Sequence, residues 1–322
     1  MSYFCRRSFI KKIFSYGFIV SLSVMTLPFF FREPSIKFIS EKFYLMGTHG
    51  KIQIFVKDID YGMFVIRKAI DRIRDIELSL TKFSPGSDVG FINTYPFVYH
   101  QVSSDTLFVL NFGKQMSFMT DGYFDMGLGN VLSSFGIDEV VPVVGECTDL
   151  DDVKGELFSV FDNQVRLIRS NTMIDLGGIG KGYALDEAMK VFLNYGIKHV
   201  AIEFGGDIKV NGGMPSGHPW LVSFDERLSF LFRSKLNFIK INTGSIAVSG
   251  GYLKKSDMSG FSNHHIVDPK SLSSRNDYFL VIVSGDKSII CDSLATACYC
   301  MDYTSLCKVK TVFSSYNVET YI

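Results

Sequence analysis

The residues whose types and spacing are most suggestive of chemistry lie in one stretch, Ile174–Phe192, which reads IDLGGIGKGYALDEAMKVF. Glycines surround a single lysine, Lys181, and a segment with helical periodicity follows. Glycine permits positive φ and a close backbone approach, and the N–H groups at a helix start bind anions. The stretch is therefore either an anion-binding loop or a tight strand-to-helix turn with a surface lysine. The glycines are Gly177, Gly178, Gly180 and Gly182.

Two familiar nucleotide-binding motifs fail on their spacing. A Walker loop requires G-x-x-x-x-G-K-[ST], but Asp175 stands at its first glycine and Gly182 at its Ser or Thr. A dinucleotide-binding G-x-G-x-x-G motif that starts at Gly178 would need its third glycine at Tyr183. Both motifs are excluded, and the loop must be interpreted from its surroundings.

Two other segments carry groups that could do chemistry. Asp292 and Thr296 belong to CDSLATA, where Asp292, considered alone, could simply cap the N-terminus of a helix. His264 and His265 are adjacent and precede Asp268-Pro269, a pair that is typical of a turn.

Taken together, the segments resemble the ApbE family, the FAD:protein FMN transferases. The resemblance extends from about Met46 to Ala297 and depends on short motifs that occur in the family's order. Each motif is weak alone, but their order makes the combination specific. The motifs are MGT, ELSLTKFSPGSDVGFIN, TDGYFDMGLGNVLSSFG, IDLGGIGKGYALD, FGGDIKVNGG, AVSGGY, HIVDP and DSLATA.

This resemblance implies an enzyme that uses FAD and Mg²⁺. It would cleave the FAD pyrophosphate, pass FMN to a Thr or Ser hydroxyl of a target protein through a phosphoester bond, and release AMP. Such chemistry depends on positioning and charge neutralisation. Two alternatives stay open: an enzyme that only hydrolyses FAD to FMN and AMP, and a membrane-anchored flavin-binding protein without turnover. The presence of both Asp292 and Thr296 argues against the second alternative.

The resemblance also implies the site residues. Magnesium would be bound by the backbone oxygen of Ala184 and the side chains of Asp292 and Thr296. Oxygen donors suit magnesium, and residues four apart share one face of a helix. His265 would lie near the pyrophosphate, where it could take the proton of the incoming hydroxyl or orient Asp268.

His265 and Asp292 are thus the predicted catalytic residues, and the flavin contacts come from aromatic, Met and charged side chains. For the aromatic residues core packing is the alternative, and for the lysine a solvated position. The predicted flavin contacts are Met46, Phe83, Tyr123, Phe124, Asp125, Lys181, Glu187 and Ile266. Gly127, Asn130 and Phe135 replace the family's usual Thr, Pro and Trp, and we expect these changes to affect packing behind the flavin.

The elements that must position these residues mix hairpins with helices. EKFYLMGTHGKIQIFV predicts a strand pair with a turn at Gly47–Gly50, and LFSVFDNQVRLIR predicts a hairpin that turns at Asp162-Asn163. Apolar residues between Ile66 and Ile76 recur at helical spacing. We therefore expect the α+β class, with mixed or antiparallel sheets and packed helices in one catalytic domain over residues 40–322.

Residues 1–34 differ in character from the rest. A basic start, MSYFCRRSFIKK, precedes the uncharged run Ile13–Phe31, which predicts a signal peptide or membrane anchor. The basic end should stay in the cytoplasm, so the domain is expected on the periplasmic side of a bacterial inner membrane, or free in the periplasm. A buried N-terminal helix is the alternative.

Charge and cysteine content limit the partners. Lys+Arg and Asp+Glu are both 33, and without a basic excess no nucleic-acid partner is expected. The resemblance implies FAD and flavin-accepting subunits of membrane redox complexes, such as sodium-translocating NADH:quinone reductase. Among the C-terminal cysteines, disulfides and buried thiols both stay open, and the lack of a C-x-x-C pair disfavours zinc. These cysteines are Cys291, Cys298, Cys300 and Cys307.

Overall fold

The computed structural model describes residues 23–25, 36–134, 155–169, 171–223, 238–250, 265–275 and 277–322. Its largest element is a seven-stranded sheet in which all neighbouring strands are antiparallel. In chain order the strands are β2 (Lys37–Leu45), β3 (Thr48–Val56), β7 (Val200–Phe204), β8 (Asp207–Asn211), β11 (Gly244–Ser249), β12 (Leu280–Gly285) and β13 (Asn317–Tyr321). Across the sheet the order is β13-β12-β11-β8-β7-β3-β2.

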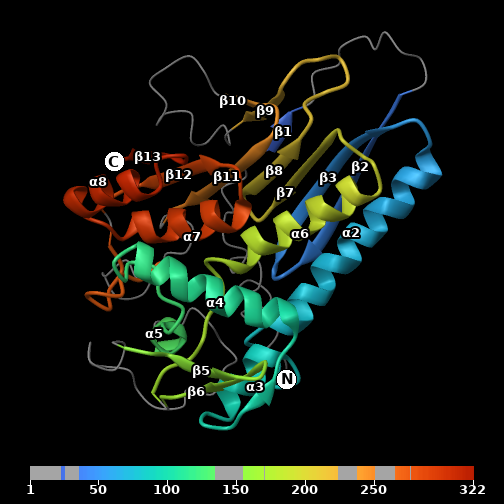
Figure 1. Ribbon diagram of the computed structural model, residues 1–322. Helices are drawn as coiled ribbons and strands as arrows, with labels where there is room; N and C mark the ends of the chain where they lie inside the picture. Colours follow the sequence, from blue (N-terminus) through green and yellow to red (C-terminus); the bar gives the residue numbers. More distant parts are fainter. Residues whose placement is uncertain are drawn as a thin grey trace, which may run out of the picture.

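Helices cover one face of this sheet (Figure 1): α2 (Ile59–Leu80), α6 (Gly180–Asn194) and α7 (Ser288–Tyr299). The predicted periodicity in α2 is confirmed, because Ile66, Ala69, Ile73 and Ile76 are fully buried in the main core. α4 (Ser104–Met119) packs against α2 and α7, and α8 (Tyr303–Val312) follows α7. These helices and the antiparallel sheet confirm the α+β class.

The opposite face of the sheet carries a second core. A small antiparallel sheet made of β1 (Ser23–Met25), β9 (Trp220–Ser223) and β10 (Phe238–Ile241) belongs to this side. Trp220 is fully buried, with its ring centroid 5.6 Å from that of Phe55. Because both faces are covered, the central strands are almost continuously apolar, as in β7.

The short strand β1 falls inside the segment that was predicted to be a signal peptide or anchor. Ser23–Met25 pairs with β9 in antiparallel register, so this stretch is extended and not helical. The remainder of residues 1–34 lies outside the described residues. Within the described ranges, no helix combines the length and the apolar character that a membrane crossing requires.

A smaller unit lies beyond α4 in Figure 1. It contains a three-stranded antiparallel sheet of β4 (His100–Gln101), β5 (Phe158–Phe161) and β6 (Gln164–Leu167), together with α3 (Asp88–Thr94) and α5 (Gly129–Ser134). The predicted hairpin between β5 and β6 is confirmed. Its turn residues Asp162 and Asn163 both have positive φ, 46° and 61°, as a tight hairpin requires.

The predicted turn between β2 and β3 was placed too late in the chain. Met46 and Gly47 form it, with φ of 48° and 69°, and Leu45 pairs with Thr48. Two left-handed residues make the shortest hairpin, so Thr48 already belongs to β3. Gly50 is a strand residue that admits a ring, since a Cβ there would lie 2.1 Å from Phe43 Cζ.

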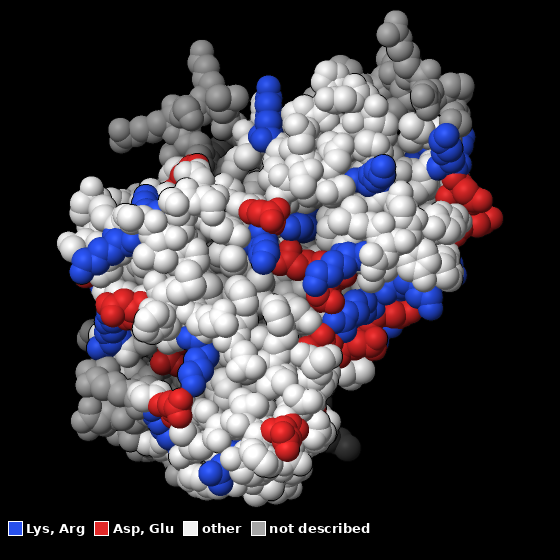
Figure 2. Space-filling model, viewed as in Figure 1, with Lys and Arg blue, Asp and Glu red and all other residues white. Residues whose placement is uncertain are grey.

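Charged groups are interspersed over the surface. On the face shown in Figure 2, blue and red side chains alternate and do not form one continuous field of either sign.

The described C-terminal cysteines are free thiols, three of them buried and Cys307 exposed. Burial raises the pKa of Cys298 to about 12, so this thiol is inert at neutral pH.

Candidate active site

A cavity of about 260 Å³ lies where the start of α6 meets α7 and the loop that follows residue 265. It gathers segments that are far apart in the sequence. Of the predicted site residues, those that line it are Tyr123, Phe124, Asp125, Lys181, His265, Ile266, Asp292 and Thr296.

The glycine loop before α6 is fixed from several sides. The Asp175 carboxylate accepts a hydrogen bond from the Gly177 N–H at 2.6 Å, and the Asp175 N–H donates to Met126 O at 2.7 Å. The Lys82 ammonium lies 2.5 Å from the same carboxylate, and both side chains are largely buried, 8% and 15% exposed. The loop is therefore held in place by an ion pair and by hydrogen bonds to its backbone.

Asp292 does not cap the helix in which it lies, which was the alternative to its predicted role as a metal ligand. α7 begins at Ser288 with Lys287 as N-cap residue, so Asp292 lies in the helix interior and does not cap it. Instead the Asp292 carboxylate accepts a hydrogen bond from the Gly182 N–H, at 2.8 Å, in the first turn of α6. A carboxylate at this end of a helix satisfies an orphan N–H and stabilises the helix dipole.

The capping is reciprocal. Asp186 on α6 accepts hydrogen bonds from the N–H groups of Ser288 and Ile289, each at 3.0 Å, at the start of α7. A carboxylate from each helix thus accepts hydrogen bonds from N–H groups in the first turn of the other helix. Gly182 makes this possible, because a Cβ there would lie 2.4 Å from Ser288 O and 2.8 Å from Asp292 Cβ. The position that a Walker loop would fill with Ser or Thr has no room for a side chain.

Lys181 lies between two carboxylates. Its ammonium is 3.2 Å from Asp207 Oδ2 and 3.2 Å from Asp292 Oδ1. Burial lowers the pKa of Lys181, but attraction to both carboxylates outweighs burial, and the net direction is upward. Burial raises the pKa of Asp207 to about 7, although the ammonium opposes this. Lys181 therefore stays charged, and the three groups together carry at most one net negative charge.

The donors available to a cation are all oxygens. Asp292 and Thr296 lie one turn apart on α7, and Thr296 Oγ1 donates to Asp292 O at 3.1 Å. Gly178 passes close by, since a Cβ there would lie 3.0 Å from Thr296 Oγ1. A carboxylate, a hydroxyl and neighbouring carbonyls fit magnesium, which takes a few protein oxygens and adds substrate phosphates. Within the described ranges, no three His, Cys, Asp or Glu side chains cluster as a self-sufficient metal site.

Ala184, whose backbone oxygen is the predicted third ligand, is fully buried in α6 and is not among the residues that line the cavity. Gly177 does line it, and its carbonyl oxygen accepts a hydrogen bond from Lys181 Nζ at 3.4 Å. Gly177 thus offers a backbone oxygen beside Lys181, and the Ala184 oxygen stays a predicted ligand.

Glu187, predicted to contact the flavin, lies outside the cavity lining. Its carboxylate is 2.8 Å from Arg72, which also forms two hydrogen bonds to Asp105. Tyr183 Oη donates to the same Asp105 at 2.5 Å, and the bond to Arg72 lowers the Asp105 pKa. This network joins α2, α4 and α6, so Glu187 supports the helix that carries Lys181.

Met46 and Phe83 also lie outside the cavity lining. The Met46 N–H donates to the Glu77 carboxylate at 2.6 Å, and a Cβ at Gly180 would approach the Met46 methyl group to 3.2 Å. Phe83 is 54% exposed, and the Lys82 ammonium lies 5.2 Å from its ring centroid. Neither Met46 nor Phe83 therefore lies in the cavity that the other predicted flavin contacts line.

The Tyr123–Asp125 segment forms one wall. Phe124 belongs to the main core and also lines the cavity, so packing and ligand contact are both available to it. Asp125 accepts the Gly127 N–H at 2.6 Å, and burial raises the Asp125 pKa. Among the replaced positions, Asn130 donates to Asn171 O at 2.7 Å, whereas Phe135 lies outside the described residues.

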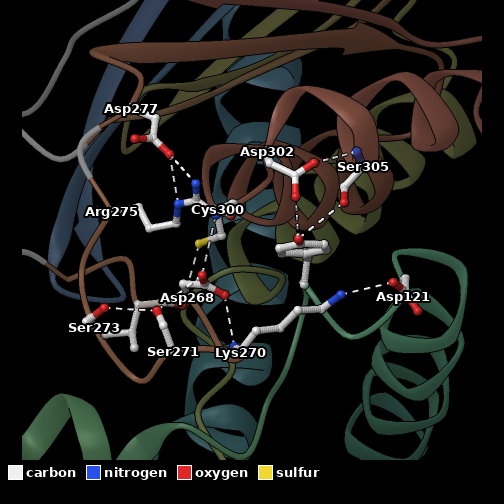
Figure 3. A network of polar contacts seen from close by, with 12 residues as sticks. Asp121, Asp268, Lys270, Ser271, Ser273, Arg275, Asp277, Cys300, Asp302 and Ser305 are labelled. Atoms are coloured by element: carbon white, nitrogen blue, oxygen red, sulfur yellow. Dashed lines mark hydrogen bonds and ion pairs between the residues drawn. The ribbon is translucent and has the colours of Figure 1, made fainter.

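The loop after His265 is held by the network in Figure 3. The Asp268 side chain accepts the Lys270 N–H at 2.9 Å, and the Asp268 N–H donates to Ser273 O, so the predicted turn is confirmed. Arg275 donates to Cys300 O at 3.2 Å and ties the loop to the end of α7. The Lys270 ammonium lies 3.8 Å from the Tyr123 ring centroid. His265 thus stands on a braced loop, while His264 lies outside the described residues.

Several residues that organise the site were not identified from the sequence. Asp175, Lys82 and Asp186 had no assigned role, and Asp207 entered only as a letter of the FGGD motif. The Gly-Gly-Asp pattern was the one available signal, because two glycines with positive φ, 62° and 96°, turn the chain directly before Asp207.

Comparison with known sequences relates the chain to one family. The model of the ApbE family matches residues 46–318. The FAD:protein FMN transferase of Vibrio cholerae is 26% identical over 263 residues, which are 78% of this chain and 78% of that protein. The FAD:protein FMN transferase of Haemophilus influenzae is 24% identical over 278 residues, 83% of this chain and 75% of that protein.

Solved structures share the fold. The ApbE protein of Thermotoga maritima superposes with a TM-score of 0.76 at 22% identity, over 88% of this chain and 94% of that one. The flavin transferase ApbE of Vibrio cholerae gives 0.74 at 21% identity, over 88% and 93%. The fold is therefore the single ApbE-like domain that the motifs implied. On the family match over most of its length, the chain belongs to the ApbE family.

Proposed function

We propose that the chain is an FAD:protein FMN transferase that requires magnesium. It takes FMN from FAD, attaches it to a Thr or Ser hydroxyl of a target protein, and releases AMP. Family membership and the names of the relatives support flavin transfer. The observation that carries the proposal is the meeting of Lys181, His265, Asp292 and Thr296 around one cavity beside the glycine loop.

The proposed reaction exchanges the phosphoanhydride bond of FAD for a phosphoester bond to the target. The target hydroxyl oxygen attacks the phosphorus of the FMN half of FAD, and the bond from that phosphorus to the AMP oxygen breaks. His265 accepts the hydroxyl proton, and AMP leaves as a phosphate monoester. Lys181 faces the pyrophosphate and offsets its charge. Asp292 and Thr296 would hold magnesium, which neutralises phosphate charge when bound.

The proposed setting is the periplasmic side of a bacterial inner membrane. The basic start and uncharged run within residues 1–34 support export or anchoring, and the targets would be flavin-accepting subunits of membrane redox complexes, such as sodium-translocating NADH:quinone reductase. The mass of the chain recovered from membranes and from periplasmic extract tests this setting. A full-length chain found only in the cytosol would contradict it.

The activity is tested by mass spectrometry of the target. The full chain is incubated with FAD, MgCl₂ and a candidate target, with a second target whose acceptor Thr is replaced by Ala. A target heavier by one FMN, and an unchanged Thr→Ala target, is the expected result. Free FMN with an unmodified target would indicate hydrolysis. Unconsumed FAD would indicate binding alone, and either outcome would overturn the proposed transfer.

A further inference from the structure

Asp207 is a buried carboxylate behind the cavity that the mechanism above leaves unused. It is 3% exposed, does not line the cavity, and follows the turn at Gly205 and Gly206. Its Oδ1 accepts a hydrogen bond from the Val248 N–H at 3.2 Å. Its Oδ2 faces the Lys181 ammonium at 3.2 Å. Within the described residues no other donor reaches this buried oxygen, so it can accept a shorter bond from Lys181.

The Asp292 carboxylate would have to bind both Lys181 and a cation. It already accepts the Gly182 N–H at 2.8 Å and contacts the Lys181 ammonium at 3.2 Å. A divalent cation bound to the same carboxylate would lie beside the positively charged Lys181 ammonium. Like charges repel strongly where water is largely excluded. Lys181 must then move away from Asp292, and within the described residues Asp207 is the other carboxylate with which it forms an ion pair.

We propose that Asp207 is a positioning residue that receives Lys181 when Asp292 takes up the cation. The inference rests on the magnesium site of the proposed function. In the structure the ammonium is shared between the two carboxylates at equal distances. Bound to Asp207 alone, it remains charged at the cavity wall and leaves Asp292 free. Asp207 thereby acts through Lys181, and it touches neither the substrate nor the cation.

A purely electrostatic role for Asp207 makes a different prediction. If Asp207 only added negative charge, it would attract a cation equally with or without Lys181. If it acts by accepting Lys181, its effect must depend on that lysine. A double-mutant cycle separates the two, because it measures the dependence of one side chain on the other. Asp207→Asn suits the cycle, since its amide oxygen can still accept the Val248 N–H.

The experiment measures Mn²⁺ affinity from the EPR signal of the free ion, with FAD present and no target. The proteins are wild type, D207N, K181M and the double variant of the full chain. Without Asp207, Lys181 pairs with Asp292 alone, so we expect D207N to weaken Mn²⁺ binding at least tenfold. In the K181M background the same substitution should change the affinity less than threefold. Thermal unfolding of each variant identifies any loss of fold, and K181Q replaces K181M if the latter does not fold.

Each outcome bears on the inference. Equal effects of D207N in both backgrounds, or no effect in either, would overturn the role of Asp207 and leave the magnesium site standing. No Mn²⁺ binding by the wild type would overturn the magnesium site, and this inference with it. A tenfold effect that disappears without Lys181 would establish the coupling.

Discussion

The close contact between α6 and α7 predicts different results for two glycines that are two residues apart. Both Gly180 and Gly182 lie in the first turn of α6. A Cβ at Gly180 would approach only the Met46 methyl group, at 3.2 Å, and Leu80 Cδ1, at 3.9 Å. A Cβ at Gly182 would lie 2.4 Å from Ser288 O and 2.8 Å from Ile289 Cα. The Gly180 obstacle is a flexible side-chain end, and the Gly182 obstacle is backbone.

The expected change in the free energy of unfolding is a balance between helix propensity and steric overlap. Replacing Gly by Ala within a helix gains up to about 1 kcal/mol of helix propensity. Overpacking costs about 1–3 kcal/mol, and more where no side chain can turn aside. Separating the helices would also weaken the bond from the Gly182 N–H to Asp292, and bonds to charged groups contribute roughly 1.5–3 kcal/mol. We expect G182A to lose about 2 kcal/mol or more and G180A to change stability by less than about 1 kcal/mol.

Urea unfolding of wild type, G180A and G182A measures these free energies, and G180A is the matched control for local propensity. Cation affinity supplies a second measurement, because displaced Asp292 should bind Mn²⁺ more weakly in G182A alone. A G182A protein as stable as G180A within about 0.5 kcal/mol would refute the reasoning, since it would show that α6 and α7 do not meet as closely as the structure has them.

Further predictions concern single charged groups. D292N should abolish AMP release from FAD, because an amide cannot replace the carboxylate that faces the cation, and wild-type rates would contradict this. K82M should destabilise by about 3–5 kcal/mol in urea unfolding, because it leaves Asp175 unpaired at a largely buried position. K114M removes a pair of similar length that is 57% and 67% exposed, so no measurable loss is expected, and equal losses would show that burial is irrelevant. Burial raises the pKa of Glu203 from 4.5 to about 7, only partly offset by Lys51 and Lys42, so the stability due to this carboxyl is complete below pH 4.5 and lost as pH rises through 7. E203Q should remove this dependence and stabilise the protein at pH 8 by up to about 3 kcal/mol, and an unchanged pH profile would argue against it.

The sequence predicted those elements whose pattern is local. The burial of Ile66 and Ile73 follows from helical spacing, and the Asp162-Asn163 turn follows from residues that tolerate positive φ. The turn at Met46 was misplaced because Gly47 and Gly50 are equally good turn residues in a sequence. Only strand register decides between them, and register depends on the partner strand. The second core around Trp220 was not predicted for the same reason. The pattern of a strand does not show which face of which sheet that strand packs against.

The site divides along a similar line. Family motifs identified residues on six separate segments, and eight of those side chains, from four of the segments, line one cavity. Contacts between segments could not be derived from spacing. Lys82 and Asp175 are 93 residues apart in the chain, and Gly182 and Asp292 are 110 apart. Asp292 shows the consequence: the sequence left a cap of its own helix open as an alternative, whereas the N–H that its carboxylate accepts lies on another helix.

The glycines that first suggested phosphate therefore have a second role. Gly182 admits α7 against α6, and Gly178 admits Thr296 against the loop. Asp292 caps α6 and Asp186 caps α7, so neither helix end can shift without breaking bonds to the other. Any ligand that positions its phosphates on the glycine loop is consequently positioned relative to Asp292 and Thr296 as well. If the chain holds a pyrophosphate and a cation as proposed, glycine has a reason to stand where a Walker loop has a hydroxyl, because the proposed cation ligands Asp292 and Thr296 come from the neighbouring helix.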